Sequence, residues 1–443
     1  MRRTLRGSLV TLTLSALLLS ACGGSSDSDA DSQTGDAPRK PGEKVELNFW
    51  SWAPEMDKTV EVFNQAHPDI HVTVNKQDGG DPAVTKLLTA IKAGSGAPDV
   101  MQAEYQAIPT MVGAGALADI KGQLGDDVKG HFAEGTWNAV TLGTDAVYAV
   151  PQDAAPLMFY YRADVFEKLG LEVPKTWDEY AEAARKINED DPKKFLGTFS
   201  ANDAGLFAGL TQQAGASWWG IDGDAWSVAI DSEPSKKVAQ YWGGLVEEGV
   251  IDNTPMYTPA WNAALNDGSQ VGWVSAVWAP GVLAGNAADT EGKWKVAPIP
   301  QWSAGENVTG AWGGSATAVT SQSENKAAAA EFATWLNTSP EGVKALASIS
   351  NVYPADTVNS GAALTEPPAF FKSQADFYDI AGSVAGTVNS FTYGPNTNVA
   401  YSAFNDAFGK AATAKKASSF AEALTTMQTQ TLDDLKANGF NVK

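Results

Sequence analysis

The chain has 443 residues, of which 44% are hydrophobic and 19% are charged, so it can bury a large core and is not disordered as a whole. Lys and Arg number 31 against 52 Asp and Glu, a net charge of −21. This balance argues against nucleic acid and against anionic lipid as partners, because both need clustered Lys and Arg. One Cys and three His leave no disulfide framework and no Cys/His zinc site.

The first residues have the pattern of an export signal. Three arginines precede an apolar stretch, residues 9–19, that is too short to span a bilayer. The stretch runs into the sequence LSACG at residues 19–23, which resembles the lipobox of bacterial lipoproteins. In that family the Cys is acylated and becomes the new N-terminus. We therefore expect residues 1–21 to be a lipoprotein signal peptide and Cys22 to carry lipid; the alternative is an ordinary secretory signal.

The segment that follows Cys22 predicts a tether. Residues 23–44 contain no large apolar side chain and are rich in Gly, Ser, Asp and Pro, so burial cannot offset the entropy of ordering them. An acylated Cys, a flexible tether over 22–44 and a globular body together predict an extracytoplasmic protein. We expect lipid to anchor it to the bacterial cell membrane.

From residue 45 onward, strand and helix patterns alternate. Period-two alternation predicts strands at 45–50 and 70–74, and a third short strand follows Pro98. Helical spacing begins near Pro54 and again at Asp81, which we expect to be an N-cap. This order predicts a parallel sheet with helices on its faces, and an α/β protein of two lobes. Further strands are predicted at 146–150, 157–161, 271–275 and 295–299, and a final helix at 419–438. Other helices are predicted with Ser323 and Ser339 as caps and with a capping box formed by Thr176 and Glu179.

Enzyme motifs are scarce. The sequence contains no G-x-S-x-G elbow, no phosphate-binding loop and no H-E-x-x-H helix, and it indicates no cofactor or metal. A glycoside hydrolase needs only two carboxylates at the correct separation, which sequence does not reveal. This class therefore stays open as the main alternative to a binding protein.

The aromatic residues favour binding. Many of the fifteen Trp lie beside turns or at strand ends, where their faces could stack on sugar rings while nearby polar side chains bond the hydroxyls. The alternative for each of them is ordinary core packing. Trp218 and Trp219 stay open between the two roles. Helical patterns assign three others to the core: Trp177, Trp242 and Trp335.

These features occur in an order that resembles a known family. Residues 45–443 resemble the solute-binding proteins of sugar ABC importers, the extracellular family that includes maltose-binding protein. Each match is weak alone, but together they cover nearly the whole body of the chain. The matching stretches are LNFWSW at 47–52, FNQAHPDIHV at 63–72, APDV at 97–100, YAVPQD at 148–153, FYYRAD at 159–164, PKTWDE at 174–179 and GGSA at 313–316.

The resemblance implies a type II-like periplasmic-binding-protein fold, with a ligand cleft at a hinge that the chain crosses several times. We place the crossings near 151–155, 307–313 and 350–355. Lobe one would then be 45–152 with 313–350, and lobe two 153–312 with 351–443. Closure around the ligand would be sensed by the importer.

The resemblance also implies ligand contacts. Trp50 and Trp52 follow the first strand, Glu104 follows the third, and Asp153 stands at the hinge as a hydroxyl acceptor. Trp278 resembles the stacking residue of the second lobe. The remaining candidates are Tyr161, Trp312, Gly313 and Gly314.

The expected ligand is a carbohydrate, and several aromatic positions favour a di- or oligosaccharide. The implied partners are the permease subunits of an ABC importer, with the receptor itself a monomer. Two alternatives remain: a lipoprotein glycoside hydrolase, and the same scaffold binding a polyamine or peptide.

Overall fold

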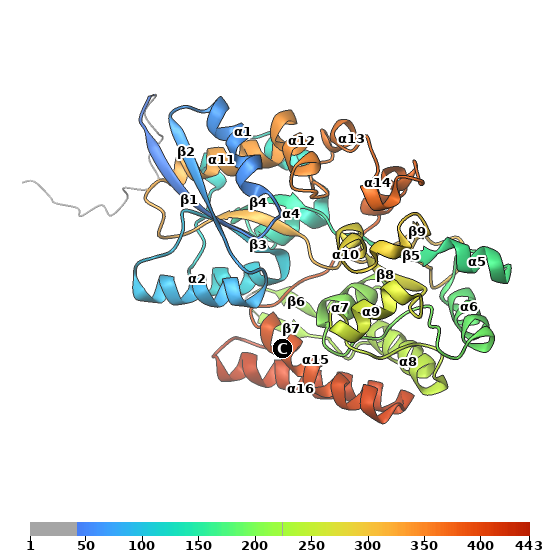
Figure 1. Cartoon of the computed structure of the whole chain (residues 1–443). Coiled ribbons are helices and arrows are strands. Elements are labelled where there is room, and N and C mark those ends of the chain that lie inside the picture. The colour runs from blue at the N-terminus through green and yellow to red at the C-terminus, as the bar shows by residue number, and fades with distance from the viewer. Residues whose placement is uncertain (1–41, 224) are drawn as a thin grey trace, which may run out of the picture. The chain divides into compact units, whose positions relative to one another are not determined.

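A computed structural model describes residues 42–223 and 225–443, and it contains two sheets that helices cover (Figure 1). The predicted signal peptide, Cys22 and nearly all of the tether lie outside the described residues. Across the two described ranges, none of the helices combines the length and apolar character that a membrane crossing needs.

The first sheet mixes parallel and antiparallel strands. The first two strands pair in parallel over their whole length, as the strand–helix–strand pattern predicts. The strand that begins at Ser315 is antiparallel to both of its neighbours, and it comes from more than 150 residues further along the chain. In spatial order the strands are β2 (Ile70–Lys76), β1 (Val45–Ser51), β3 (Val100–Glu104), β10 (Ser315–Val319) and β4 (Ala149–Asp153).

An aromatic cluster holds helices against this sheet. Phe49 of β1 contacts Phe332 edge-to-face at 5.4 Å between ring centroids, and Phe63 contacts the same ring at 5.0 Å. All three rings are fully buried, so they anchor the helices that carry them. The helices of this part are α1 (Met56–Ala66), α2 (Asp81–Ala93), α3 (Ile108–Gly113), α4 (Glu134–Thr141), α11 (Lys326–Thr338), α12 (Pro340–Ser348) and α13 (Ser360–Ala363), with the 3₁₀ turns η1 (Tyr105–Ala107), η2 (Lys121–Gln123) and η3 (Val128–His131).

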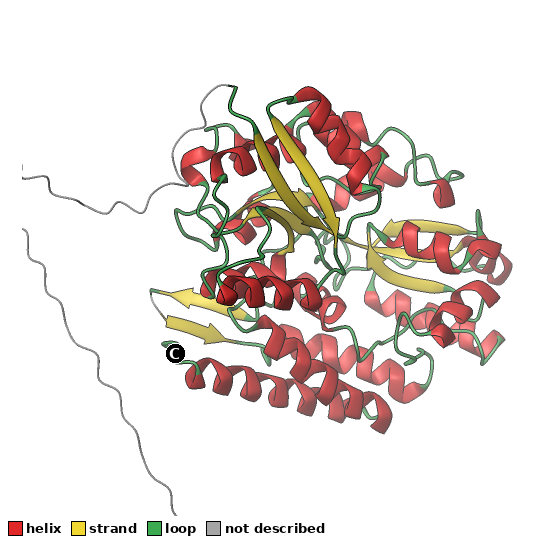
Figure 2. Cartoon of the chain, turned by 60° about the vertical axis from the view of Figure 1, so that its left-hand side comes forward, coloured by secondary structure: helices red, strands yellow, loops and turns green. Residues whose placement is uncertain are grey.

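The second sheet is antiparallel, with β5 (Leu157–Arg162) between β8 (Gly272–Ala276) and β9 (Trp294–Pro298). Every residue of β5 is buried, which fits a central strand covered on both faces. Beside the C-terminus lies a hairpin of β6 (Trp219–Asp222) and β7 (Ala225–Val228) (Figure 2). The helices here are α5 (Ala163–Leu169), α6 (Trp177–Asp190), α7 (Ala204–Gln213), α8 (Glu233–Glu248), α9 (Pro259–Asp267), α10 (Ala279–Asn286), α14 (Phe377–Ala385), α15 (Thr397–Ala414) and α16 (Ala417–Ala437), with η4 (Ala288–Thr290) and η5 (Ala369–Phe371).

Among the helix caps predicted from the sequence, the structure confirms the one at the start of α6 and contradicts those of α2 and α11. Helix α6 begins with the capping box that the sequence predicts, because the backbone N–H of Glu179 donates to Thr176 Oγ1 at 3.2 Å and the Glu179 carboxylate accepts in return. Two predicted caps are wrong. Helix α2 starts at Asp81 itself after Gly80, and α11 is preceded by Asn325 rather than Ser323.

Three chain segments lie together between the two sheets. The backbone N–H of Trp312 donates to the Ala155 carbonyl at 3.0 Å, and the backbone N–H of Ala154 donates to the Tyr353 carbonyl at 3.0 Å. The chain thus passes between the sheets as three segments that hydrogen-bond to one another, rather than as a single linker. This arrangement confirms the predicted two-lobe α/β fold with a multi-crossing hinge.

The described residues form two hydrophobic cores, one around each sheet. The division of the chain into lobes stays a prediction. Residues shortly after the third crossing contact the first core: Asp356 forms a β-bridge with Phe132, and Asn359 donates to the Thr338 carbonyl at 2.9 Å. These contacts place the segment around α13 beside the first sheet.

Two glycines let α7 pack directly on the second crossing. A Cβ at Gly310 would lie 1.8 Å from the Gly209 carbonyl oxygen, which is far inside van der Waals contact. We expect Gly310→Ala to lower the free energy of unfolding by about 3 kcal/mol, because backbone must move on both sides. Gly244→Ala on α8, where the added methyl meets nothing within 4 Å, is the control. Equal melting temperatures by calorimetry for the two variants would contradict this close approach.

Candidate functional site

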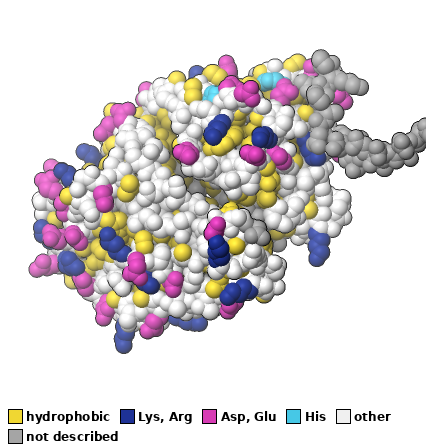
Figure 3. Space-filling view, turned by 180° about the vertical axis from the view of Figure 1, so that it is seen from behind, with side chains coloured by type: hydrophobic (Ala, Val, Ile, Leu, Met, Phe, Trp, Pro, Cys, Tyr) yellow, Lys and Arg dark blue, Asp and Glu magenta, His cyan; other side chains and the backbone are white. Residues whose placement is uncertain are grey.

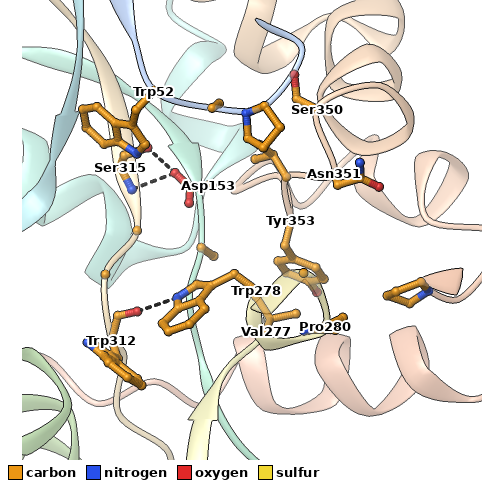
Figure 4. A pocket seen from close by; sticks show the side chains of 18 of the residues that line it. Trp52, Asp153, Val277, Trp278, Pro280, Trp312, Ser315, Ser350, Asn351 and Tyr353 are labelled. Carbon is orange, nitrogen blue, oxygen red and sulfur yellow. Dashed lines mark hydrogen bonds between the residues drawn. The ribbon is translucent and has the colours of Figure 1, made fainter. Parts of the chain in front are cut away.

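A cavity of about 710 Å³ lies where the crossings meet the ends of β1, β3, β4 and β8 (Figure 4). Its volume falls within the range of about 300–1,000 Å³ that is usual for small-molecule sites. A second cavity of about 390 Å³ shares Glu104, Asp203, Trp312 and Gly313 with the first, so the two form one cleft. The aromatic residues lining the larger cavity are Trp52, Tyr257, Trp278, Trp312, Tyr353, Phe370 and Tyr378.

Gln102, a buried residue of β3, organises the wall from the first sheet. Its Oε1 accepts from Ser51 Oγ at 2.7 Å and from the Trp52 N–H at 3.2 Å, and thereby fixes the turn after β1. Its Nε2 donates to Ser315 Oγ at 3.0 Å. One amide therefore connects the ends of β1 and β10 and holds Trp52 at the cavity.

Asp153 lies at the end of β4, beside Ser315. The Ser315 N–H donates to Asp153 Oδ1 at 2.7 Å, and the Ser315 hydroxyl bonds the same oxygen (Figure 4). Burial raises the pKa of the Asp153 carboxyl to about 6, against these two bonds, which lower it. Above that pH the group is a carboxylate at the cavity wall, suited to accept hydrogen bonds from a ligand.

Trp278 and Trp312 form the opposite wall (Figure 4). Trp278 is the residue before α10, and its Nε1–H donates to the Trp312 carbonyl at 2.9 Å. The two rings meet edge-to-face with centroids 4.7 Å apart, and Trp273 of β8 packs behind both. Trp278 is thus held in one orientation, with part of its surface open to the cavity.

Asp203 caps helix α7 where the two cavities join. Its Oδ1 accepts from the Leu206 N–H at 3.0 Å. Burial raises the pKa of the Asp203 carboxyl to about 7, while hydrogen bonds from Leu206, Gly205 and Trp312 act in the opposite direction. The described residues contain no cluster of His, Cys, Asp and Glu that could hold a metal ion.

The turn from Trp312 into β10 needs glycine. Gly313 and Gly314 have φ of 85° and 90°, in the region that other residues rarely adopt. A Cβ at Gly314 would also lie 2.8 Å from the Tyr105 ring. This turn brings the backbone of the second crossing to the cavity surface.

Most of the residues proposed from the sequence come together at this cleft, and two do not. Trp50 is only 8% exposed and packs into the first core, with Lys86 Nζ 4.4 Å from the centre of its ring. Tyr161 lies four residues beyond the hinge end of β5, about 13 Å at strand rise, and packs on Phe166. Those that line the cleft are Trp52, Glu104, Asp153, Trp278, Trp312, Gly313 and Gly314.

The structure also assigns the Trp pair that the sequence left open. Trp218 and Trp219 are 0% and 2% exposed and belong to the second core. Trp177 and Trp242 are buried there as well, and Trp335 packs on the first core, as their helical patterns predict.

Sequence reasoning missed several lining residues, among them Gln102, Asp203, Tyr257 and Tyr378. Asp203 alone carries a local signal, since an Asp before the helical stretch 204–213 is a typical N-cap. Tyr257 and Tyr378 lie in or near irregular segments, and only their tertiary contacts place them at the cleft.

The buried carboxyl groups predict a specific pH dependence of stability. The folded pKa of Asp203, about 7, lies above its ordinary value of 3.8, so protonation favours the folded state. Its contribution to stability is therefore greatest below pH 4 and is lost as pH rises to about 7. We expect Asp203→Asn, which keeps a capping oxygen, to stabilise the protein at pH 8 by about 1–3 kcal/mol relative to wild type, and by much less at pH 4. A melting-temperature difference that does not change with pH would contradict this.

Comparisons with known proteins agree with this geometry. The family described as bacterial extracellular solute-binding protein matches residues 39–343. The arabinooligosaccharide-binding protein of Halalkalibacterium halodurans is 25% identical over 300 residues, which are 65% of this chain and 66% of that protein. The protein of the same description from Bacillus subtilis is 23% identical over 77% of this chain and 78% of its own length.

Solved structures extend the likeness to the whole body of the chain. The galacto-N-biose/lacto-N-biose I-binding protein of the ABC transporter from Bifidobacterium longum, in complex with lacto-N-biose, is 30% identical with a TM-score of 0.80. The alignment covers 91% of this chain and 100% of that one. An ABC transporter associated binding protein from B. animalis subsp. lactis Bl-04, in complex with β-1,6-galactobiose, is 27% identical with a TM-score of 0.76, over 90% of this chain and 100% of its own. The chain therefore belongs to the bacterial extracellular solute-binding protein family.

Proposed function

We propose that this protein captures a sugar of two or more rings in the cleft and delivers it to an ABC importer. The observation that carries the proposal is one cleft with aromatic faces on both walls and a hydrogen-bonded carboxylate, Asp153, between them. Aromatic faces pack on the C–H faces of sugar rings, and carboxylates accept hydrogen bonds from hydroxyls. Trp52, Trp278 and Asp153 are the proposed ligand contacts.

The two walls come from different cores. Trp52 follows β1 of the first sheet, whereas Trp278 follows β8 of the second. A sugar that touches both residues binds more tightly to a closed arrangement of the lobes than to an open one, and so shifts the population toward closure. The importer can recognise that closed form.

The relatives supply the class of ligand. Two binding proteins of similar structure hold disaccharides, and two curated relatives are named for arabinooligosaccharides. The volume of the larger cavity suits ligands of this size. We propose that the protein acts as a monomer outside the cytoplasm, with Cys22 acylated and the permease subunits of the importer as its partners.

Calorimetric titration of the soluble chain 23–443 with mono-, di- and trisaccharides tests the proposal, with chromatography of each sugar afterwards. We expect saturable binding of at least one intact oligosaccharide. Accumulation of a hydrolysis product would instead identify a glycoside hydrolase. Binding of polyamines or peptides with no sugar bound would assign the scaffold to another ligand class.

A further inference from the structure

The charged groups of the cleft are all of one sign. Glu104, Asp153 and Asp203 line it, and within the described residues neither cavity is lined by any Lys, Arg or His. We infer that the cleft selects sugars without carboxylate, sulfate or phosphate groups. This inference rests on the proposed function, the binding of a sugar in the cleft.

An acidic sugar could still be held by backbone donors at a helix N-terminus. Helix α7 begins at the cleft, but Asp203 already occupies its N-terminus and accepts from the Leu206 N–H. An incoming anion would displace that carboxylate or lie beside it, and either arrangement is unfavourable. The N-terminus of α7 therefore offers no anion site.

Helix α10 also begins at the cleft, and it is no better supplied. Helices α14 and α15 reach the cleft as well, and they contribute Tyr378 and Asn398 from their first turns. The second residue of α10, Pro280, has no N–H, and the N–H of Gly281 donates to the Trp278 carbonyl at 3.2 Å. At the hinge, the Ser315 N–H is bonded to Asp153. The backbone donors of Leu206, Gly281 and Ser315 are thus already used, and Pro280 has none to offer.

The polar residues of the smaller cavity suit hydroxyl or acetamido groups. They are neutral amides and hydroxyls, which both donate and accept hydrogen bonds, and so they can pair with the uncharged polar groups of a ligand. An anion in this cleft would lose its hydration and meet carboxylates in return, which is costly. These residues are Gln106, Asn202, Asn398, Tyr401, Ser402 and Asn405.

The net charge of the whole chain does not explain the same selectivity. Acidic and basic side chains are interspersed over the face shown in Figure 3. At 0.15 M salt the screening length is about 8 Å, so exposed charges away from the cleft act weakly on a bound ligand. Groups within the cleft decide which sugars enter.

The test is a panel of neutral oligosaccharides and of their sialylated, sulfated and uronic counterparts, titrated at pH 8 in 0.15 M salt. We expect every sugar that binds to be free of anionic groups, and the acidic counterpart of each to bind at least about 20-fold more weakly. An acidic sugar that binds as tightly as its neutral counterpart would overturn the inference and leave the proposed function intact. A panel in which no sugar binds would overturn the proposed function and this inference with it.

A positive charge introduced into the cleft distinguishes the effect of charges that line the cleft from the effect of the protein's net charge. Asn405 is exposed on α15 and lines the smaller cavity. Asn405→Lys should improve binding of the acidic counterparts about fivefold or more, whereas Asn438→Lys, the same change at the end of α16, should not. Equal effects of the two variants would show that net charge decides, and would overturn the inference.

Discussion

We expect Trp278→Ala to weaken sugar binding by about 30-fold or more. The ring supplies one wall of the cleft, is fixed by the bond from its Nε1 to the Trp312 carbonyl, and keeps part of its surface open to the cavity. Removing an anchored aromatic contact of this kind costs about 2 kcal/mol or more. Calorimetric titration with a sugar that the wild-type chain binds measures the change directly.

Two further variants separate binding from folding. Trp278→Leu keeps apolar packing against Trp273 and Trp312, and should still lose most of the affinity because it offers no flat face. Trp226→Ala, in the β6–β7 hairpin beside Val442, should bind as the wild type does. Wild-type affinity in both Trp278 variants would contradict the assignment of this wall.

Asp153→Asn should lower affinity and raise the stability of the unliganded protein. Its Oδ1 can still accept from Ser315, but the charge that faces the cavity is gone. Hydrogen bonds to charged groups contribute about 1.5–3 kcal/mol, so binding should weaken by about 10- to 100-fold at pH 8.

The gain in stability has a definite sign. Burial raises the pKa of Asp153 to about 6 in the folded protein, above its ordinary 3.8, so the ionised carboxylate destabilises the fold above about pH 6. The Asn variant should therefore melt at a higher temperature at pH 8 and at a nearly unchanged one at pH 4. Asp433→Asn, exposed on α16, should change neither affinity nor melting temperature. A variant of Asp153 that is less stable at pH 8 would contradict this account.

The buried carboxylates of Asp153 and Asp203 thus destabilise the fold at high pH, although they suit the binding of hydroxyl groups. Gln102 and Ser315 hold the first wall, and the Trp278–Trp312 pair holds the second. The proposed ligand contacts are held by these bonds without a ligand, so we expect little of the binding energy to be spent on ordering them.

Local patterns predicted much of the fold. Parallel pairing of β1 with β2 follows from the alternation of strands with helices, and α6 begins at the Thr176–Glu179 capping box. The position of β10 between β3 and β4 could not be predicted in this way. That pairing joins Ser315 to Glu104 and to Asp153, and no short-range pattern encodes contacts between residues so far apart in the sequence.

The site was predictable where a strand ends at the cleft. Asp153 is the last residue of β4, and Trp52 and Trp278 come just after β1 and β8, each at a strand end that meets the hinge. Trp50 is also a Trp and lies only two residues before Trp52, but it is still within β1 and is buried in the first core. Tyr161 lies on β5, whose first residues are at the hinge, but it is near the other end of that strand.

Residues from distant segments were beyond local reasoning. Tyr353 reaches the cleft because the third crossing bonds to Ala154, and Tyr378 because α14 packs beside β9. Neither contact has a signature in the neighbouring sequence.

A crystal structure of the chain 23–443 with the sugar that binds most tightly tests the central claim most directly. We predict an intact sugar in the cleft, with one ring against Trp278 and a hydroxyl bonded to Asp153. A sugar bound elsewhere on the protein, or one cleaved in the cleft, would contradict the account.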